Sequence, residues 1–156
     1  METNHPTKQA TTLLTYFGAI PFLIAVFIGL SPYLSLPEFL GGEIAYSGFK
    51  AKALMHSYAV VILSFIAGIQ WGISLYDNKR TMVLWLSSFL ALLAWLSLMA
   101  FATKMALSVL LFGFIVALVA DRKAYINHII PVWFWQLRKK ISLIVCLSLL
   151  TIILLK

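Results

Sequence analysis

The chain has 156 residues, of which 62% are hydrophobic and 11% are charged, and its mean hydropathy is +0.98. This balance differs from that of a soluble domain and indicates that lipid is the main solvent, which leaves no room for a separate soluble catalytic module. The formal charge of +7 comes from Lys and Arg scattered between apolar runs, so binding to nucleic acid is not indicated.

The order of apolar runs predicts an all-α integral membrane protein, a compact bundle of about five transmembrane helices in a single membrane domain over residues 1–156. The first helix is expected over residues 13–31, with a kink at Pro21 because proline frees a backbone carbonyl. A loop rich in Pro and Gly follows at 32–50 on the outer side. The second helix is expected over residues 52–76, just before Asp77.

The stretch from Thr81 to Ala120 contains a single charge, Lys104, and as one helix it would be about twice as long as the hydrocarbon core is thick. We therefore expect a turn at Lys104, which gives helices over residues 82–102 and 105–120. Cations and aromatic residues mix over residues 121–137, which predicts an inner interfacial segment with Trp133 and Trp135 at headgroup depth. The last helix is expected over residues 138–155.

The distribution of cations predicts the orientation of the bundle. With the N-terminus inside, eight Lys and Arg residues lie on the inner side, namely Lys8, Lys79, Arg80 and the five within residues 121–140. The outer side holds four, namely Lys50, Lys52, Lys104 and Lys156. Because cytoplasmic loops carry the excess of Lys and Arg, we expect a cytoplasmic N-terminus, a C-terminus on the outer side and a bacterial inner membrane.

Small residues recur every four positions in the second helix, at Ser64, Gly68 and Gly72. Such a helix-packing ridge lets another helix approach closely, either inside the bundle or from a partner subunit. Ridges of this kind are common in membrane helices, so packing is the simpler interpretation and a ligand groove is the alternative. His56, near the outer end of the same helix, is expected to have an interfacial, hydrogen-bonded role.

Polar residues at the predicted inner ends of the helices form the second candidate site. Charged residues there are ordinarily solvated helix ends. The sharper hypothesis is an inner-leaflet pocket for a lipid or quinone head group, built from Gln70, Trp71, Asp121, Trp133 and Arg138. We also expect Arg138 to turn toward Asp121 or Asp77.

No catalytic, cofactor-binding or metal-binding set is indicated. The chain has no P-loop, no HExxH, no GxSxG and no CxxC motif. Its single cysteine, Cys146, excludes an internal disulfide and a cysteine metal cluster. The absence of these motifs favours a non-enzymatic protein and no cofactor.

Short motifs in a fixed order resemble those of one family. They are Tyr58, Ser64-Phe65, Gly68 and Trp71-Gly72, preceded by residues 18–22 and followed by Ala94-Trp95, Gly113-Phe114, Asp121, Trp133, Leu137-Arg138 and Ser142. Over residues 16–150 the chain resembles the transmembrane protein 69 family, also called domain of unknown function 3429 (DUF3429). The resemblance implies a small multi-helix membrane protein of bacteria or of the mitochondrial inner membrane, with no established activity. Members often have Gly at the position of Ala67 and a basic residue at that of Gln70, which counts against a catalytic role for Gln70 here.

These patterns favour an accessory, assembly or lipid-binding factor that acts through helix packing. Two alternatives stay open, a quinone-linked membrane oxidoreductase subunit or anchor, and a small transporter that works as a parallel dimer. The expected partners are membrane lipids, a second copy of the chain or a membrane complex, and no nucleic acid.

Overall fold

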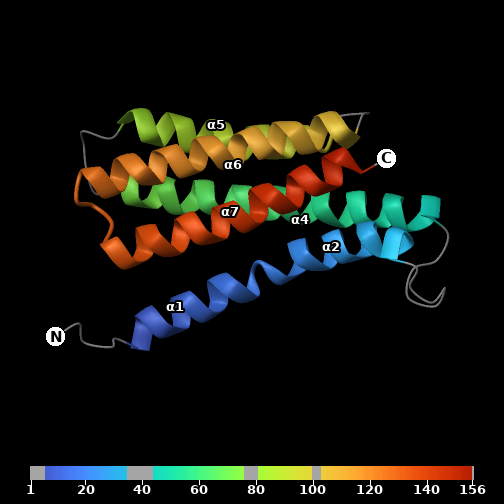
Figure 1. The fold of residues 1–156 in the computed structure, drawn as a ribbon. Coiled ribbons are helices and arrows are strands. Elements are labelled where there is room, and N and C mark those ends of the chain that lie inside the picture. Colours follow the sequence, from blue (N-terminus) through green and yellow to red (C-terminus); the bar gives the residue numbers. More distant parts are fainter. Residues whose placement is uncertain (1–5, 35–43, 76–80, 100–102, 156) are drawn as a thin grey trace.

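The protein is a bundle of α-helices that run roughly alongside one another (Figure 1). The structure, a computed structural model, describes residues 6–34, 44–75, 81–99 and 103–155. In chain order the helices are α1 (Pro6–Phe17), α2 (Ile20–Leu30), a 3₁₀ turn η1 (Ser31–Leu34), α4 (Ile44–Ser74), α5 (Thr81–Ser97), α6 (Thr103–Ile126) and α7 (Val132–Leu154). The described residues contain no β-strand, so the all-α class is confirmed.

The first crossing is broken into α1 and α2 near Pro21. Proline has no N–H to continue the helix, and the next amide, that of Phe22, bonds the carbonyl of Ala19 at 3.1 Å instead of reaching back to Gly18. The freed Gly18 carbonyl accepts a hydrogen bond of 2.9 Å from the hydroxyl of Tyr58 on α4. The expected kink is therefore a full break that α4 holds in place.

The central helix is α4, which packs against α2, α5, α6 and α7. Its inward stripe of Met55, Ala59, Leu63 and Ala67 is almost fully buried. Two glycines let neighbouring helices approach closely, because a Cβ on Gly113 would lie 2.6 Å from a methyl group of Leu63 and one on Gly29 would lie 2.8 Å from Ile152. The core thus depends on Gly29 and Gly113.

The outer surface of the bundle is apolar, as a membrane protein requires. Three helical stretches are long and apolar enough to cross a bilayer, Thr7–Tyr33, Gly48–Ser74 and Thr103–Ile126, and α5 is a shorter apolar helix. Large side chains such as Phe65, Phe112 and Leu143 are exposed on the outside. With α7 these helices form one bundle, in which the start of α1 and the end of α7 lie at opposite ends (Figure 1).

Helix bounds differ from the expected ones on both sides of the membrane. Helix α4 begins at Ile44, within the expected outer loop of 32–50; residues 35–43 of that loop, like Asp77, lie outside the described residues. Most of residues 121–137 belong to the two flanking helices, because α6 continues to Ile126 and α7 begins at Val132 instead of 138. The physical reason is that Asp121 and Arg138 are buried and paired, so neither charge ends a helix.

The turn between α6 and α7 is short and closes in a defined way. His128 adopts a left-handed backbone conformation with φ of 56°. The amide of Ile129 bonds the carbonyl of Ala124 and that of His128 bonds Tyr125, the pattern of a Schellman C-cap. Pro131 then stands at the N-cap of α7, where its missing N–H has no cost. This turn fixes α7 against α6 and so sets the position of Arg138.

Candidate functional site

Three helices bring one polar residue each to the same depth in the bundle. Gln70 lies about 6 Å before the end of α4, Asp121 about 8 Å before the end of α6, and Arg138 about 9 Å after the start of α7, as the helical rise predicts. Their exposed fractions are 4%, 7% and 9%. The sequence suggests solvated helix ends for the charged pair, and the structure instead places all three inside the bundle.

Hydrogen bonds join these side chains into a polar cluster, the Gln70–Asp121–Arg138 triad. One carboxylate oxygen of Asp121 accepts a bond of 2.7 Å from Nε of Arg138. The other oxygen accepts a bond of 3.0 Å from the amide of Gln70, which also donates to the backbone carbonyl of Ala117 at 2.9 Å. The expectation that Arg138 turns toward Asp121 or Asp77 is thus met at Asp121.

Two side chains of the triad keep hydrogen-bonding groups that another molecule can use. Oε1 of Gln70 is buried and has no hydrogen-bond partner among the described residues. Arg138 bonds Asp121 through Nε, and no group in the described part of the chain bonds its terminal amino groups. A guanidinium presents five N–H donors in a planar fork suited to carboxylate or phosphate. The terminal amino groups of Arg138 are therefore buried donors that can bind such a group.

Arg138 also lines an apolar cavity of about 340 Å³, the Arg138 cavity, between α1, α4 and α7. The other lining residues include Thr11, Leu14 and Thr15 of α1, Phe22 of α2, Phe65, Ile66 and Ile69 of α4, and Phe134, Ser142 and Val145 of α7. From Phe134 to Val145 it extends about 16 Å along α7, which corresponds to half the thickness of the hydrocarbon core. It exists because the break at Gly18 directs α1 away from the bundle while α2 stays packed (Figure 1).

The cavity faces the surrounding lipid. Leu14 and Phe65, on its two flanks, are 68% and 65% exposed. Its polar groups gather around Arg138 and Ser142, one turn apart on α7, while its far end at Phe22 and Val145 is apolar. A site with one donor-rich end and one apolar end matches an amphiphile.

The remaining residues of the expected pocket do not join the triad. Trp71 is 44% exposed on α4, and Trp133 lines a different recess between α1 and α7. Ser142 was named only among the family motifs, and neither it nor the cavity residues of α1 were expected to belong to a site. The spacing of Arg138 and Ser142, four positions apart on one helix face, is the signal that could have linked them.

The ridge of Ser64, Gly68 and Gly72 does not face the bundle interior at its glycines. A Cβ added at Gly68 or Gly72 would meet no described atom within 4 Å, and Gly68 is exposed. The buried stripe of α4 instead runs through Leu63 and Ala67. Packing of these two glycines inside the bundle is therefore not observed, while packing against a partner subunit and a ligand groove both stay open.

His56 forms the hydrogen bond expected of it. Its Nε2 lies 3.1 Å from the hydroxyl oxygen of Ser97 on α5, and that hydroxyl donates to the carbonyl of Ala94. This contact ties α4 to α5 at the end of the bundle opposite to Arg138.

Comparisons with known proteins agree on one family and add a relative. The family described as "Protein of unknown function (DUF3429)" matches residues 7–154. A protein of Xenopus tropicalis named "Transmembrane protein 69" is 31% identical over 135 residues, which cover 83% of this chain and 52% of the relative. The chain therefore spans about half the length of that relative. No solved structure matches.

Proposed function

Because the chain belongs to the DUF3429 family, whose description assigns no activity, we propose from its own site that it is a lipid-binding accessory protein of the membrane. It holds the chain of a membrane amphiphile in the Arg138 cavity and binds the acceptor head group of that molecule through the terminal amino groups of Arg138. We place it in the bacterial inner membrane with a cytoplasmic N-terminus, where it acts with lipids, a second copy or a membrane complex.

The observation that supports this proposal is the position of Arg138. The side chain is 10% exposed, its charge is balanced by Asp121 through a bond to Nε, and it borders an apolar cavity. A buried cation in a membrane protein is costly and usually functional. A purely structural ion pair would not require a cavity beside it.

The size and lining of the cavity favour a chain-like ligand. Ligand sites commonly have volumes of about 300–1,000 Å³, and this cavity, of about 340 Å³, lies at the lower end of that range. Its volume is therefore suited to one acyl or isoprenoid chain. The cavity faces lipid, so any further chain of the ligand can remain in the bilayer.

Lipid analysis of the purified protein tests the proposal. Bound amphiphiles are extracted from the protein purified in detergent. They are then identified by mass spectrometry and counted per polypeptide. Ile69→Trp fills the cavity from a half-exposed position without touching the triad. Because overpacking costs about 1–3 kcal/mol, we expect a loss of bound amphiphile of about ten-fold.

Leu143→Trp is the matched control, since Leu143 is exposed on α7 and does not line the Arg138 cavity. It should retain the ligand at the wild-type ratio. If Ile69→Trp retained as much bound amphiphile as the wild type, the Arg138 cavity would not be the binding site. Recovery of a stoichiometric quinone instead of an acyl lipid would favour the quinone-linked alternative.

A further inference from the structure

The wall of the Arg138 cavity contains a hydroxyl group without a hydrogen bond, that of Ser142. Ser142 is 4% exposed and lines the cavity one turn after Arg138. A serine in a helix commonly donates to the carbonyl four residues earlier, and Ser148 of the same helix does so to Ile144 at 2.8 Å. Ser142 forms no hydrogen bond with any group in the described part of the chain. Its proton is therefore available to a molecule in the cavity.

The other hydroxyl groups that line the cavity already donate to the backbone. Thr11 and Thr15 of α1 each donate to the carbonyl four residues earlier, at 2.7 Å. Among the described lining residues, the donors that a head group can use are thus the terminal amino groups of Arg138 and the hydroxyl of Ser142. They start from positions about 6 Å apart along α7, as the helical rise predicts.

The charge of Arg138 is balanced before any ligand binds. Arg138 is the one charged side chain among the described residues that line the cavity, and Asp121 neutralises it at 2.7 Å. A guanidinium without a partner would favour a carboxylate or phosphate. Here an added anion would leave one uncompensated negative charge in an apolar place, which is costly. An uncharged acceptor avoids that cost.

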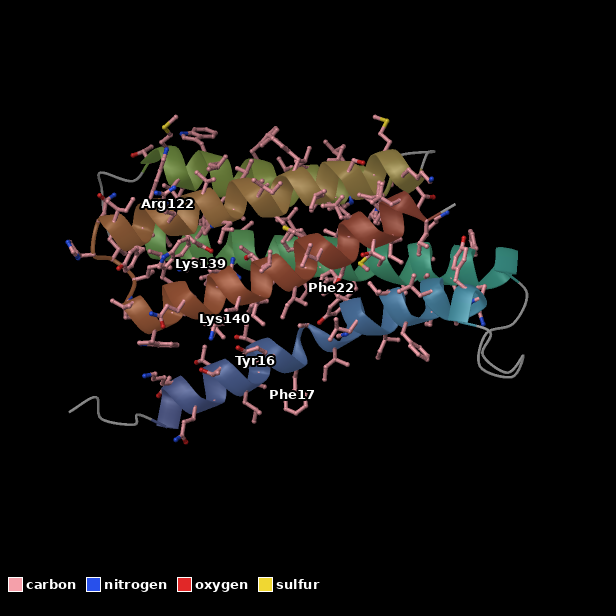
Figure 2. All side chains as sticks on the ribbon, viewed as in Figure 1. Tyr16, Phe17, Phe22, Arg122, Lys139 and Lys140 are labelled. Carbon is pink, nitrogen blue, oxygen red and sulfur yellow. The ribbon has the colours of Figure 1, made fainter. Side chains whose placement is uncertain are left out.

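The two lysines that follow Arg138 in the sequence do not line the Arg138 cavity. The ammonium of Lys139 lies 5.4 Å from the ring centre of Trp135, which stacks on Tyr125 of α6. Lys140 lies in the space between α7 and α1 (Figure 2), where it lines a separate recess. The cavity therefore offers hydrogen-bond donors without a net positive charge.

We propose that the Arg138 cavity selects an amphiphile with an uncharged carbonyl head group and that Ser142 is the second polar contact of that group. The terminal amino groups of Arg138 donate to the carbonyl oxygen, and the hydroxyl of Ser142 donates to another oxygen of the same head group. The ester of an uncharged acylglycerol and the ring of a long-chain quinone share this chemistry. The inference rests on the proposed function and names the class of its ligand.

Two lipids that differ by one phosphate test the inference. Monooleoylglycerol and oleoyl lysophosphatidic acid have the same glycerol and the same acyl chain, and the second lipid adds the phosphate. Native mass spectrometry of the full chain in detergent measures their binding at neutral pH. The wild type should bind monooleoylglycerol about ten-fold more tightly, because an uncompensated buried charge is costly. Equal or tighter binding of lysophosphatidic acid would overturn the selection of an uncharged head group.

Ser142→Ala tests the second contact. It should weaken the binding of monooleoylglycerol about five-fold, the effect of one lost hydrogen bond. Ser148→Ala is the matched control, because Ser148 is also buried on α7 but does not line the cavity. It should bind as the wild type does, within a factor of about two. An unchanged affinity in Ser142→Ala would overturn the role of Ser142.

Two further arms identify the source of the carbonyl and the place of binding. A quinone with a decyl tail competes with monooleoylglycerol, and the tighter ligand of the two shows whether the carbonyl comes from a quinone or from an ester. Ile69→Trp should weaken the binding of either. If it weakened neither, the Arg138 cavity would not be the site and the proposed function would fail. If it weakened the binding of a preferred lysophosphatidic acid, the proposed function would stand and the uncharged head group would be wrong.

Discussion

Single residues decide whether a charge can stay inside this bundle. Asp121 and Arg138 are tolerated because each neutralises the other at 2.7 Å and because Gln70 satisfies the second carboxylate oxygen. Gln70 supplies N–H donors without adding a charge. The neutral amide leaves the triad without net charge, which lowers the cost of burying it.

Removing one partner of the buried pair should be far more harmful than removing both. Asp121→Leu or Arg138→Met leaves one uncompensated charge, and we expect each to lower the free energy of unfolding by about 3–5 kcal/mol. The double variant should be closer to the wild type than either single variant. Thermal unfolding in detergent, followed by tryptophan fluorescence, measures all three.

Arg122→Met is the control for this series, because Arg122 follows Asp121 directly but is exposed. Its unfolding temperature should match the wild type. A double variant as unstable as the sum of its single variants would contradict the coupling of Asp121 and Arg138.

The three polar residues of the triad could be predicted from the sequence, but their geometry could not. Gln70, Asp121 and Arg138 stand at matching depths once the crossings are assigned, which is a matter of counting residues. Trp71 follows Gln70 directly and yet is 44% exposed. About 100° of helix rotation separates the two, and that rotation is set by packing against other helices.

At the scale of elements, the bounds of the helices show where charge patterns mislead. From the sequence, one helix is expected to end before Asp121 and the last one to start at Arg138. The reason is that charged residues usually lie where a helix leaves the membrane and enters water. The pair instead lies between α6 and α7, so both helices extend past it. The number and order of crossings followed from apolar runs alone, since these depend only on length and composition.

Close helix contacts occur at glycines outside the small-residue ridge. Gly113→Val should lower the free energy of unfolding by about 1–3 kcal/mol, because its Cβ would lie 2.6 Å from a terminal methyl of Leu63. Gly68→Val meets no described atom within 4 Å and should change stability by less than about 0.5 kcal/mol. Thermal unfolding in detergent compares the two variants.

The same Gly68→Val variant tests the partner interpretation of the ridge. If a second subunit packs on Ser64, Gly68 and Gly72, the variant should lower the oligomeric mass measured by light scattering while its unfolding temperature stays unchanged. An unchanged mass would leave the ridge without a packing partner.

At the scale of the whole molecule, the cations at the α6–α7 end predict which side faces the cytoplasm. With Cys146 replaced by Ser, single cysteines at Lys123 and Lys139 should react with a membrane-impermeant maleimide only from the inner side. A cysteine at Lys104, at the opposite end of α6, should react only from the outer side. The reverse pattern would invert the topology and place the Gln70–Asp121–Arg138 triad toward the outer leaflet.

The break at Gly18 also divides the first crossing into two units of different local stability. Helix α2 packs against α4 and α7, whereas the main helix contact of α1 is with α7. In hydrogen–deuterium exchange the amides of α1 should therefore open at a lower free energy than those of α2. A long-chain molecule could enter the Arg138 cavity through this local opening of α1, while α2 and the helices behind it stay folded.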